Sequence, residues 1–177
     1  MGKAMSRLGR PRVRLLLLGL DAAGKTTVLA WMKKGAHQET VPTIGFNVEE
    51  ILYNRTRIQI WDVGGQDRLR ALWRPHYRGT SGIIFVVDSS DAARITLARQ
   101  ELMSLMKEEA LNGVCLCILA NKQDLPAAIS TQDLAIALGV AQIEALGYTC
   151  TVIASIANQG EGIDTALRWL SGHAKPI

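Results

Sequence analysis

Cysteine is scarce in this 177-residue chain, and its three cysteines lack the spacing of metal ligands. Cys115 and Cys117 stand in one apolar run and Cys150 is isolated. We therefore expect buried thiols in a reducing cytosol rather than a disulfide framework. No apolar run reaches the roughly 18 residues that a membrane-spanning helix needs. The apolar run at residues 15–18 is also too short to act as a secretory signal.

Acidic residues are absent from the first 14 positions, which hold five of the 20 basic residues. The rest of the chain carries 15 basic residues against 16 acidic ones, so we expect a basic arm at residues 1–12 and one near-neutral domain at residues 13–177. Such an arm favours a membrane surface or another acidic partner, although a solvated tail without function has the same composition. No nucleic-acid partner is expected.

The N-terminus also carries a short lipidation pattern. Gly2 and Ser6 fit M-G-x-x-x-[ST], the pattern for N-myristoylation at the glycine. Because one acyl chain binds a bilayer only weakly, the basic arm would supply the second membrane signal.

Short apolar runs alternate with helical patterns along the remaining chain. Strands are predicted at residues 14–18, 46–53, 57–62, 82–88, 114–120 and 148–154, the second and third joined by a turn at 54–56. Helices are predicted at residues 27–34, at 91–110 with Asp91 as N-cap, at 131–138 with Thr131 as N-cap, and at 163–172. This order predicts an α/β fold: a six-stranded, mostly parallel sheet with helices on both faces.

Residues 19–26 fit the phosphate-loop pattern G-x-x-x-x-G-K-[ST] between a predicted strand and a predicted helix. A turn of this kind makes a nest of backbone N–H groups that, with the helix dipole, holds polyphosphate oxygens. Lys25 would reach the β- and γ-phosphates, and the Thr26 hydroxyl would ligate Mg²⁺. The nucleotide-binding candidates here are Gly19, Leu20, Asp21, Ala22, Ala23, Gly24, Lys25, Thr26 and Thr27.

Two further strand ends carry chemistry. Asp62 would anchor Mg²⁺ through water, Gly65 would bring a backbone N–H to the γ-phosphate, and Gln66 would orient an attacking water. Residues 121–124 read Asn-Lys-Gln-Asp. The Asp124 carboxylate could accept the ring N–H and the exocyclic amino group of guanine, and Lys122 could cover the ring. This favours GTP over ATP and disfavours an ATP-dependent kinase or ATPase.

These motifs together resemble those of the Arf and Arf-like small GTPases over about residues 13–172. The matching segments are residues 19–27, 42–49, 61–66 and 120–125. The resemblance implies a P-loop NTPase with a Ras-like G domain. It also implies that Thr43 binds Mg²⁺ and the γ-phosphate, that Ala157 reads guanine through its backbone N–H, that Asn121 belongs to the base site, and that Asp21 lies beside the γ-phosphate.

The family resemblance further implies a monomeric switch that cycles between GDP and GTP and recruits effectors to a membrane in trafficking. Partners would be an exchange factor, a GTPase-activating protein (GAP) and effectors, bound through Thr43, Phe46, Trp61 and the segment after Gln66. Because no arginine finger is evident in cis, we expect slow hydrolysis by Lys25 and Gln66 until a GAP assists. A GTP-dependent scaffold with negligible hydrolysis is the alternative.

Departures from the family pattern favour the Arf-like branch. The N-terminus lacks the aromatic anchors of a membrane-inserting helix, so we expect peripheral attachment to the Golgi or another endomembrane through acylation and basic charge. The residues at 46–62 have a composition that would permit the family's two-residue hairpin slide.

His76 stands where the family's exposed aromatic triad has tyrosine, and is read as a surface residue, a pH sensor or a metal ligand. Trp73 is either a core residue or a partner contact.

Overall fold

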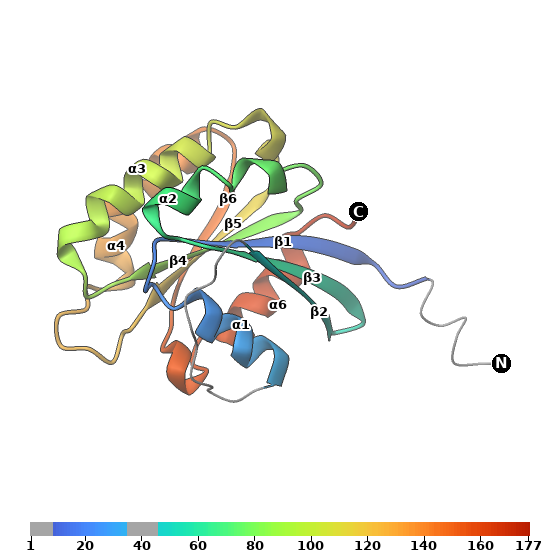
Figure 1. The fold of residues 1–177 in the computed structure, drawn as a ribbon, viewed down its shortest axis with the longest axis horizontal. Coiled ribbons are helices and arrows are strands. Elements are labelled where there is room, and N and C mark those ends of the chain that lie inside the picture. Colours follow the sequence, from blue (N-terminus) through green and yellow to red (C-terminus); the bar gives the residue numbers. More distant parts are fainter. Residues whose placement is uncertain (1–8, 35–45) are drawn as a thin grey trace.

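A single sheet of six strands organises the computed structural model, which describes residues 9–34 and 46–177 (Figure 1). The strand order is β2-β3-β1-β4-β5-β6, with only the β2–β3 pair antiparallel. The strands are β1 (Arg12–Leu18), β2 (Phe46–Tyr53), β3 (Thr56–Val63), β4 (Gly82–Asp88), β5 (Cys115–Asn121) and β6 (Thr149–Ala154). The predicted fold class is therefore confirmed.

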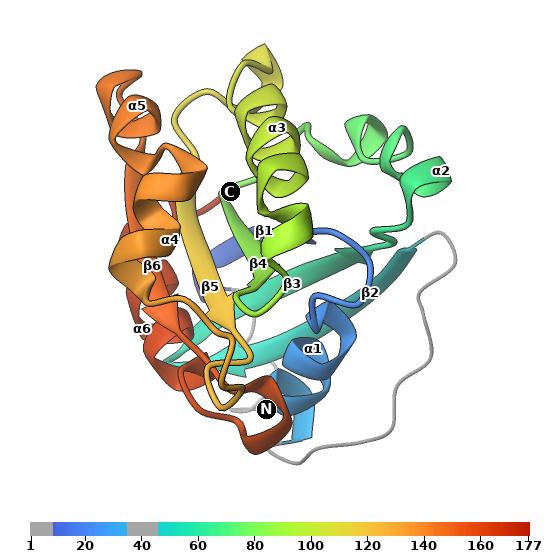
Figure 2. The same ribbon diagram turned by 90° about the vertical axis from the view of Figure 1, so that its left-hand side faces the viewer.

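Helices cover both faces of this sheet, which explains why its central strands are apolar on both sides (Figures 1 and 2). One face packs against α1 (Lys25–Lys34) and α6 (Ile163–His173). The other packs against α3 (Ile95–Leu105) and α4 (Thr131–Leu138), with α2 (Asp67–Arg70) and α5 (Val140–Ala145) nearby. Short 3₁₀ turns are η1 (Arg74–His76), η2 (Ala92–Arg94), η3 (Glu109–Leu111) and η4 (Ala157–Gln159).

The β2–β3 hairpin closes at the predicted place, but its turn has two residues instead of the predicted three, because Thr56 already pairs with Tyr53 as the first residue of β3. Asn54 and Arg55 have φ angles of 44° and 66°, the left-handed values of a type I′ turn that matches the twist of the strands. The register pairs Phe46 with Val63 and Tyr53 with Thr56. The structure holds this one register, so the two-residue slide stays a prediction.

The predicted helix at residues 91–110 is wrong at both ends. The Asp91 side chain caps no helix, because its carboxylate accepts a hydrogen bond from Arg94 Nε at 2.7 Å, and η2 precedes α3. At the other end α3 stops at Leu105. Glu108 then turns extended and its carboxylate accepts from Arg74 Nη2 at 2.7 Å.

The predicted N-cap of α4 is off by one residue. Ser130, not Thr131, has the extended backbone of a cap, and its hydroxyl accepts a hydrogen bond from Asp133 N at 3.1 Å. Gly139, in the left-handed conformation, ends α4 and starts α5, a short helix that the sequence pattern did not predict.

Trp73 belongs to the core, which settles one of the alternatives. Its side chain is buried, and the indole N–H donates to the Gly64 carbonyl oxygen at 2.9 Å. The bond attaches the segment after Gln66 to the end of β3.

Two of the five basic residues counted at the N-terminus lie in β1: Arg14, which was predicted in this strand, and Arg12, which was predicted in the arm. The Arg12 guanidinium pairs with Glu50 at 3.3 Å, and the Arg14 guanidinium lies 4.2 Å from the centre of the Trp61 ring. Strand β1 begins at Arg12, so the sheet takes in charge that was expected to face a membrane.

The remaining composition-based expectations concern cysteines and membranes. Cys115 and Cys117 are buried and Cys150 is partly buried, and all three are free thiols, as predicted. Within the described ranges, no helix is both long and apolar enough to cross a membrane.

The corrected cap of α4 can be tested with two neighbouring substitutions. Ser130→Ala should lower the free energy of unfolding by about 1 kcal/mol, since the Asp133 N–H loses its acceptor. Thr131→Ala is the matched control and should cause no comparable loss, because it places a good helix former in the first turn. Urea unfolding measures both; a larger loss from Thr131→Ala would contradict the assignment.

Candidate functional site

The predicted site residues gather where the parallel strands end. The segment at 19–24 follows β1, Gly64–Gln66 follow β3, residues 122–124 follow β5, and residues 155–157 follow β6. Parallel strands present their carboxyl ends at one edge of a sheet, so these four segments share one side of the molecule.

The phosphate-loop segment needs glycine at its last position before α1. Gly24 has a φ angle of +106°, and a Cβ atom there would lie 2.3 Å from the Asn121 side-chain nitrogen. With Lys25 as its first residue, α1 directs its free N-terminal N–H groups toward this loop. The turn and the helix start lie where the pattern requires them, and the binding of phosphate there stays a prediction.

Lys25 is buried, with a relative exposure of 7%, and its ammonium donates to the Leu20 carbonyl oxygen at 2.7 Å. Burial lowers the pKa of Lys25 to about 8, although the carboxylates of Asp62 and Asp21 oppose the shift. Lys25 is therefore a cation held inside the loop, short of countercharge.

The two predicted metal ligands of the described chain, Thr26 and Asp62, lie together. The Thr26 hydroxyl donates to Asp62 Oδ2 at 3.2 Å, and the Asp62 side chain is buried at the end of β3. A hydroxyl and a carboxylate are the hard oxygen donors that Mg²⁺ prefers, so this donor set fits the ion. The third predicted ligand, Thr43, lies outside the described residues.

The glycine segment after β3 lies directly against the phosphate loop. The Asp21 N–H donates to the Gly65 carbonyl oxygen at 3.0 Å. A Cβ atom on Gly65 would lie 2.3 Å from Lys25 Nζ and 2.3 Å from the Gly19 carbonyl oxygen, so no larger residue fits. Gln66 follows at the N-cap of α2, where its carbonyl oxygen accepts from Leu69 N.

Asn121 connects the phosphate loop with the loop after β6. Its side-chain nitrogen donates to the Ala23 carbonyl oxygen at 2.9 Å, and its side-chain oxygen accepts from Ser155 Oγ at 3.1 Å and from Ala157 N at 3.0 Å. The predicted contact of the Ala157 N–H with guanine would have to share that donor. Asn121 therefore has a structural task that the motif alone does not reveal.

A cleft of about 170 Å³ opens beside Asn121, between Gly24, Lys122, Asp124 and Ala157. Lys122 has a φ angle of 63°, a conformation that non-glycine residues rarely adopt. Its ammonium lies 2.7 Å from Asp88 Oδ2, which fixes the stem at the rim of the cleft. The Asp124 side chain is exposed in the same opening.

The aromatic cluster that the family pattern predicts is assembled on β2, β3 and η1. The His76 ring lies 4.8 Å from the Phe46 ring centre and 5.2 Å from that of Trp61. Burial and the nearby Arg14 charge lower the pKa of His76, so the imidazole is neutral and acts as an aromatic member of the cluster. In the part of the chain that the structure describes, no three His, Cys, Asp or Glu side chains form a metal-binding group.

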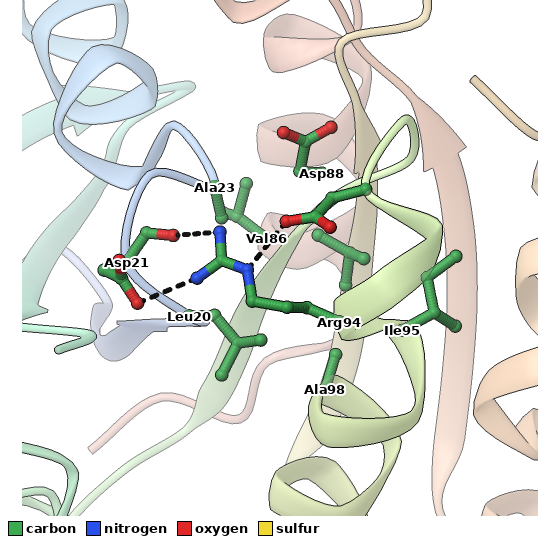
Figure 3. A pocket seen from close by; sticks show the side chains of 10 residues that line it. Leu20, Asp21, Ala23, Val86, Asp88, Arg94, Ile95 and Ala98 are labelled. Atoms are coloured by element: carbon green, nitrogen blue, oxygen red, sulfur yellow. Dashed lines mark hydrogen bonds and ion pairs between the residues drawn. The ribbon is translucent and has the colours of Figure 1, made fainter. Parts of the chain in front are cut away.

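Sequence reasoning missed two residues of this region. Arg94 reaches from η2 to the phosphate loop and contacts Asp21 (Figure 3), and Ser155 orients the Asn121 amide. An arginine at the start of a helix ordinarily faces solvent, so nothing local distinguishes Arg94. Its partner lies 73 residues away, and only the fold brings them together.

Comparison with known proteins places this geometry in a family. A family model described as the ADP-ribosylation factor family matches residues 1–174. Among solved structures, the Arl6 (BBS3) small GTPase from Trypanosoma brucei, with bound nucleotide analogue GppNp, is 30% identical to this chain. The match covers 91% of this chain and 96% of that one, with a TM-score of 0.84.

Because Asn121 bridges two loops, replacing its side chain should lower the stability of the protein. Asn121→Ala should lower the free energy of unfolding by about 2–4 kcal/mol, because the buried Ala23 carbonyl and Ala157 N–H lose their partner. Asp124→Ala, an exposed change in the same cleft, is the control and should leave stability nearly unchanged. Both are measured in urea with EDTA and without nucleotide, so that ligand binding adds nothing. Equal losses would contradict the bridging role.

The burial of Lys25 predicts a pH-dependent stability. Its folded pKa of about 8 lies below the roughly 10.4 of an unfolded lysine, so the charged group opposes folding below pH 8 and less so as the pH rises. The stability of Lys25→Met relative to wild type should therefore fall by about 2 kcal/mol between pH 7 and pH 9.5. Urea unfolding without nucleotide measures it, with exposed Lys107→Met as control. A constant difference would mean that Lys25 is not desolvated.

Proposed function

The chain belongs to the ADP-ribosylation factor family of small GTPases, and we propose that it is a GTP-controlled switch that recruits effector proteins to a membrane in vesicle or protein trafficking. As a member of that family it binds GTP and hydrolyses it to GDP and phosphate. One observation carries the site assignment: the phosphate loop, the Thr26–Asp62 pair and the cleft beside Asn121 meet at one edge of the sheet.

The phosphates belong at the N-terminus of α1. There backbone N–H groups at the start of α1 receive the oxygens, and Lys25 exchanges its bond to the Leu20 carbonyl for the β- and γ-phosphates. Burial favours this exchange, since a partly desolvated ammonium gains more from an anion than a hydrated one does. Thr26 and Asp62 would hold Mg²⁺, Asp62 through water, and a bound Mg²⁺ would neutralise charge on the phosphate oxygens.

The base belongs in the cleft beside Asn121. Asp124 accepts the two N–H donors on one edge of guanine, and the stem of Lys122, fixed by its ion pair with Asp88, covers the ring. Adenine offers no such pair of donors, which supports GTP as the ligand. Asn121 keeps the base cleft and the phosphate loop in a fixed relation.

Hydrolysis would use residues next to the phosphate loop. Gln66, at the N-cap of α2, orients the attacking water, and the Gly65 backbone N–H meets the γ-phosphate. Within this site we assign no arginine to the transition state, so a GAP would supply one and the unassisted rate would be slow.

Partner binding is proposed at the aromatic cluster of Phe46, Trp61 and His76 and along the segment after Gln66. Phe46 is 49% exposed, which supports a role as an effector contact. Thr43, proposed to couple this surface to the γ-phosphate, and Gly2, proposed to carry myristate, lie outside the described residues. With Arg12 and Arg14 engaged in the sheet, Lys3, Arg7 and Arg10 remain for an anionic bilayer.

The proposal is tested by nucleotide competition and single-turnover hydrolysis with Mg²⁺. GTP should displace a bound fluorescent GDP at far lower concentration than ATP does. Pre-bound GTP should convert slowly to GDP, and Gln66→Leu should slow this by about tenfold or more while GTP stays bound. Exposed Gln132→Leu, on α4, is the matched control and should hydrolyse at the wild-type rate.

Two outcomes would change the assignment. Preference for ATP would overturn the base site. Tight GTP binding with no phosphate release, alike in wild type and Gln66→Leu and with an added GAP, would favour the scaffold alternative.

A further inference from the structure

An ion pair joins the phosphate loop to the start of the α3 segment. Arg94 Nη1 lies 2.9 Å from Asp21 Oδ1, and Arg94 Nη2 donates to the Asp21 carbonyl oxygen at 3.1 Å. Arg94 Nε donates to Asp91 Oδ2 at 2.7 Å, so one guanidinium uses three nitrogens on two acidic residues. Such a fork fixes direction as well as charge.

Asp21 is also bonded to the glycine segment after β3. Its backbone N–H donates to the carbonyl oxygen of Gly65, the residue on which an added Cβ atom would lie 2.3 Å from Lys25 Nζ. The Asp21 residue therefore links Arg94 on one side to Gly65 on the other. Any movement of Asp21 would change the position of the Gly65 backbone.

Without Arg94, the carboxylate of Asp21 would oppose the binding of a polyphosphate at this end of the loop. Asp21 places a carboxylate at the end of the loop where Lys25 lies, near enough to influence the Lys25 charge. A γ-phosphate there would add further negative charge and be repelled by that carboxylate. The Arg94 guanidinium neutralises the carboxylate and draws it toward η2, and Asp91 holds the guanidinium in place.

The hollow beside this pair has a volume of about 10 Å³, room for about one water molecule, and Leu20, Val86, Ile95 and Ala98 form its apolar floor. The apolar floor supports the Arg94 side chain (Figure 3).

We propose that Arg94 is a positioning residue for GTP: it neutralises Asp21 and holds the Asp21–Gly65 contact, so that the site accepts a γ-phosphate. The inference rests on the proposed nucleotide site and adds a residue to it. It assigns Arg94 an effect on GTP that exceeds its effect on GDP, because GDP has no phosphate at this end of the loop.

The test compares dissociation rates of fluorescent GTP and GDP analogues, with Mg²⁺, from full-length wild type and variants. Arg94→Ala should release the GTP analogue about three- to tenfold faster and the GDP analogue less than about twofold faster, the modest size reflecting a partly exposed pair. Arg94→Lys should recover only part of the loss, since an ammonium cannot reproduce the fork. Arg99→Ala, on α3 and bonded to Gln142, is the matched control and should match wild type.

A double variant separates positioning from direct contact. If Arg94 acts by compensating Asp21, then adding Asp21→Asn to Arg94→Ala should restore GTP retention to within about twofold of Asp21→Asn alone. If Arg94 instead contacts the phosphate itself, the full loss would persist in the Asp21→Asn background and the inference would be wrong.

Loss of the nucleotide site and loss of the Arg94 role would give different results. Wild type that binds neither analogue would overturn the proposed function. Wild type that binds both, with Arg94→Ala releasing them at unchanged rates or equally faster, would overturn only the role of Arg94.

Discussion

The side-chain amide of Asn121 holds the phosphate loop and the loop after β6 in a fixed position relative to each other. It donates to Ala23, which lies 98 residues earlier, and accepts from Ser155 and Ala157 in the loop after β6. All three bonds are buried, and a buried polar network is stable only when each member is satisfied. The bonds also constrain the chain around them, because the amide approaches so closely that position 24 accepts no side chain. The distance between the phosphate loop and the loop after β6 therefore depends on one residue that a motif would assign to base contact alone.

A second constraint is the contact between the phosphate loop and the segment after β3. Gly65 lies so near Lys25 Nζ and the Gly19 carbonyl that the two loops can move past each other only by separating. Trp73 anchors the far side of the same segment through Gly64, and Arg94 anchors the phosphate loop through Asp21. A ligand that changes the Gly65 position thus acts on both anchors. This is the mechanical requirement of a switch, in which a small local change must shift an element that has two arrangements.

The sequence predicts those parts of this structure that rest on local patterns. Apolar runs, together with the alternation at residues 57–62, identify the six strands, and the spacing from Gly19 to Thr26 between a strand and a helix predicts a phosphate nest. The sequence does not predict features that depend on which of several possible hydrogen-bond partners a side chain binds. Asp91 has the side chain of a helix cap but binds Arg94, and Thr131 loses the cap of α4 to Ser130 because of backbone direction. Arg94 and Asp21 meet only after the sheet has formed, so no window of sequence contains them both.

The role of Arg14 in the fold differs from the one that its place in a basic N-terminal sequence suggests. Counted along the sequence, Arg14 adds to a basic arm, but in the fold it lies over the Trp61 ring and donates to the His76 carbonyl oxygen at 3.1 Å. Burial disfavours the charged form of His76, and the Arg14 cation beside it acts in the same direction, so the pKa of the imidazole is lowered. A neutral ring can then stack where a charged one would be repelled. The arginine that was counted with the basic N-terminus therefore helps to keep the imidazole of the aromatic cluster uncharged.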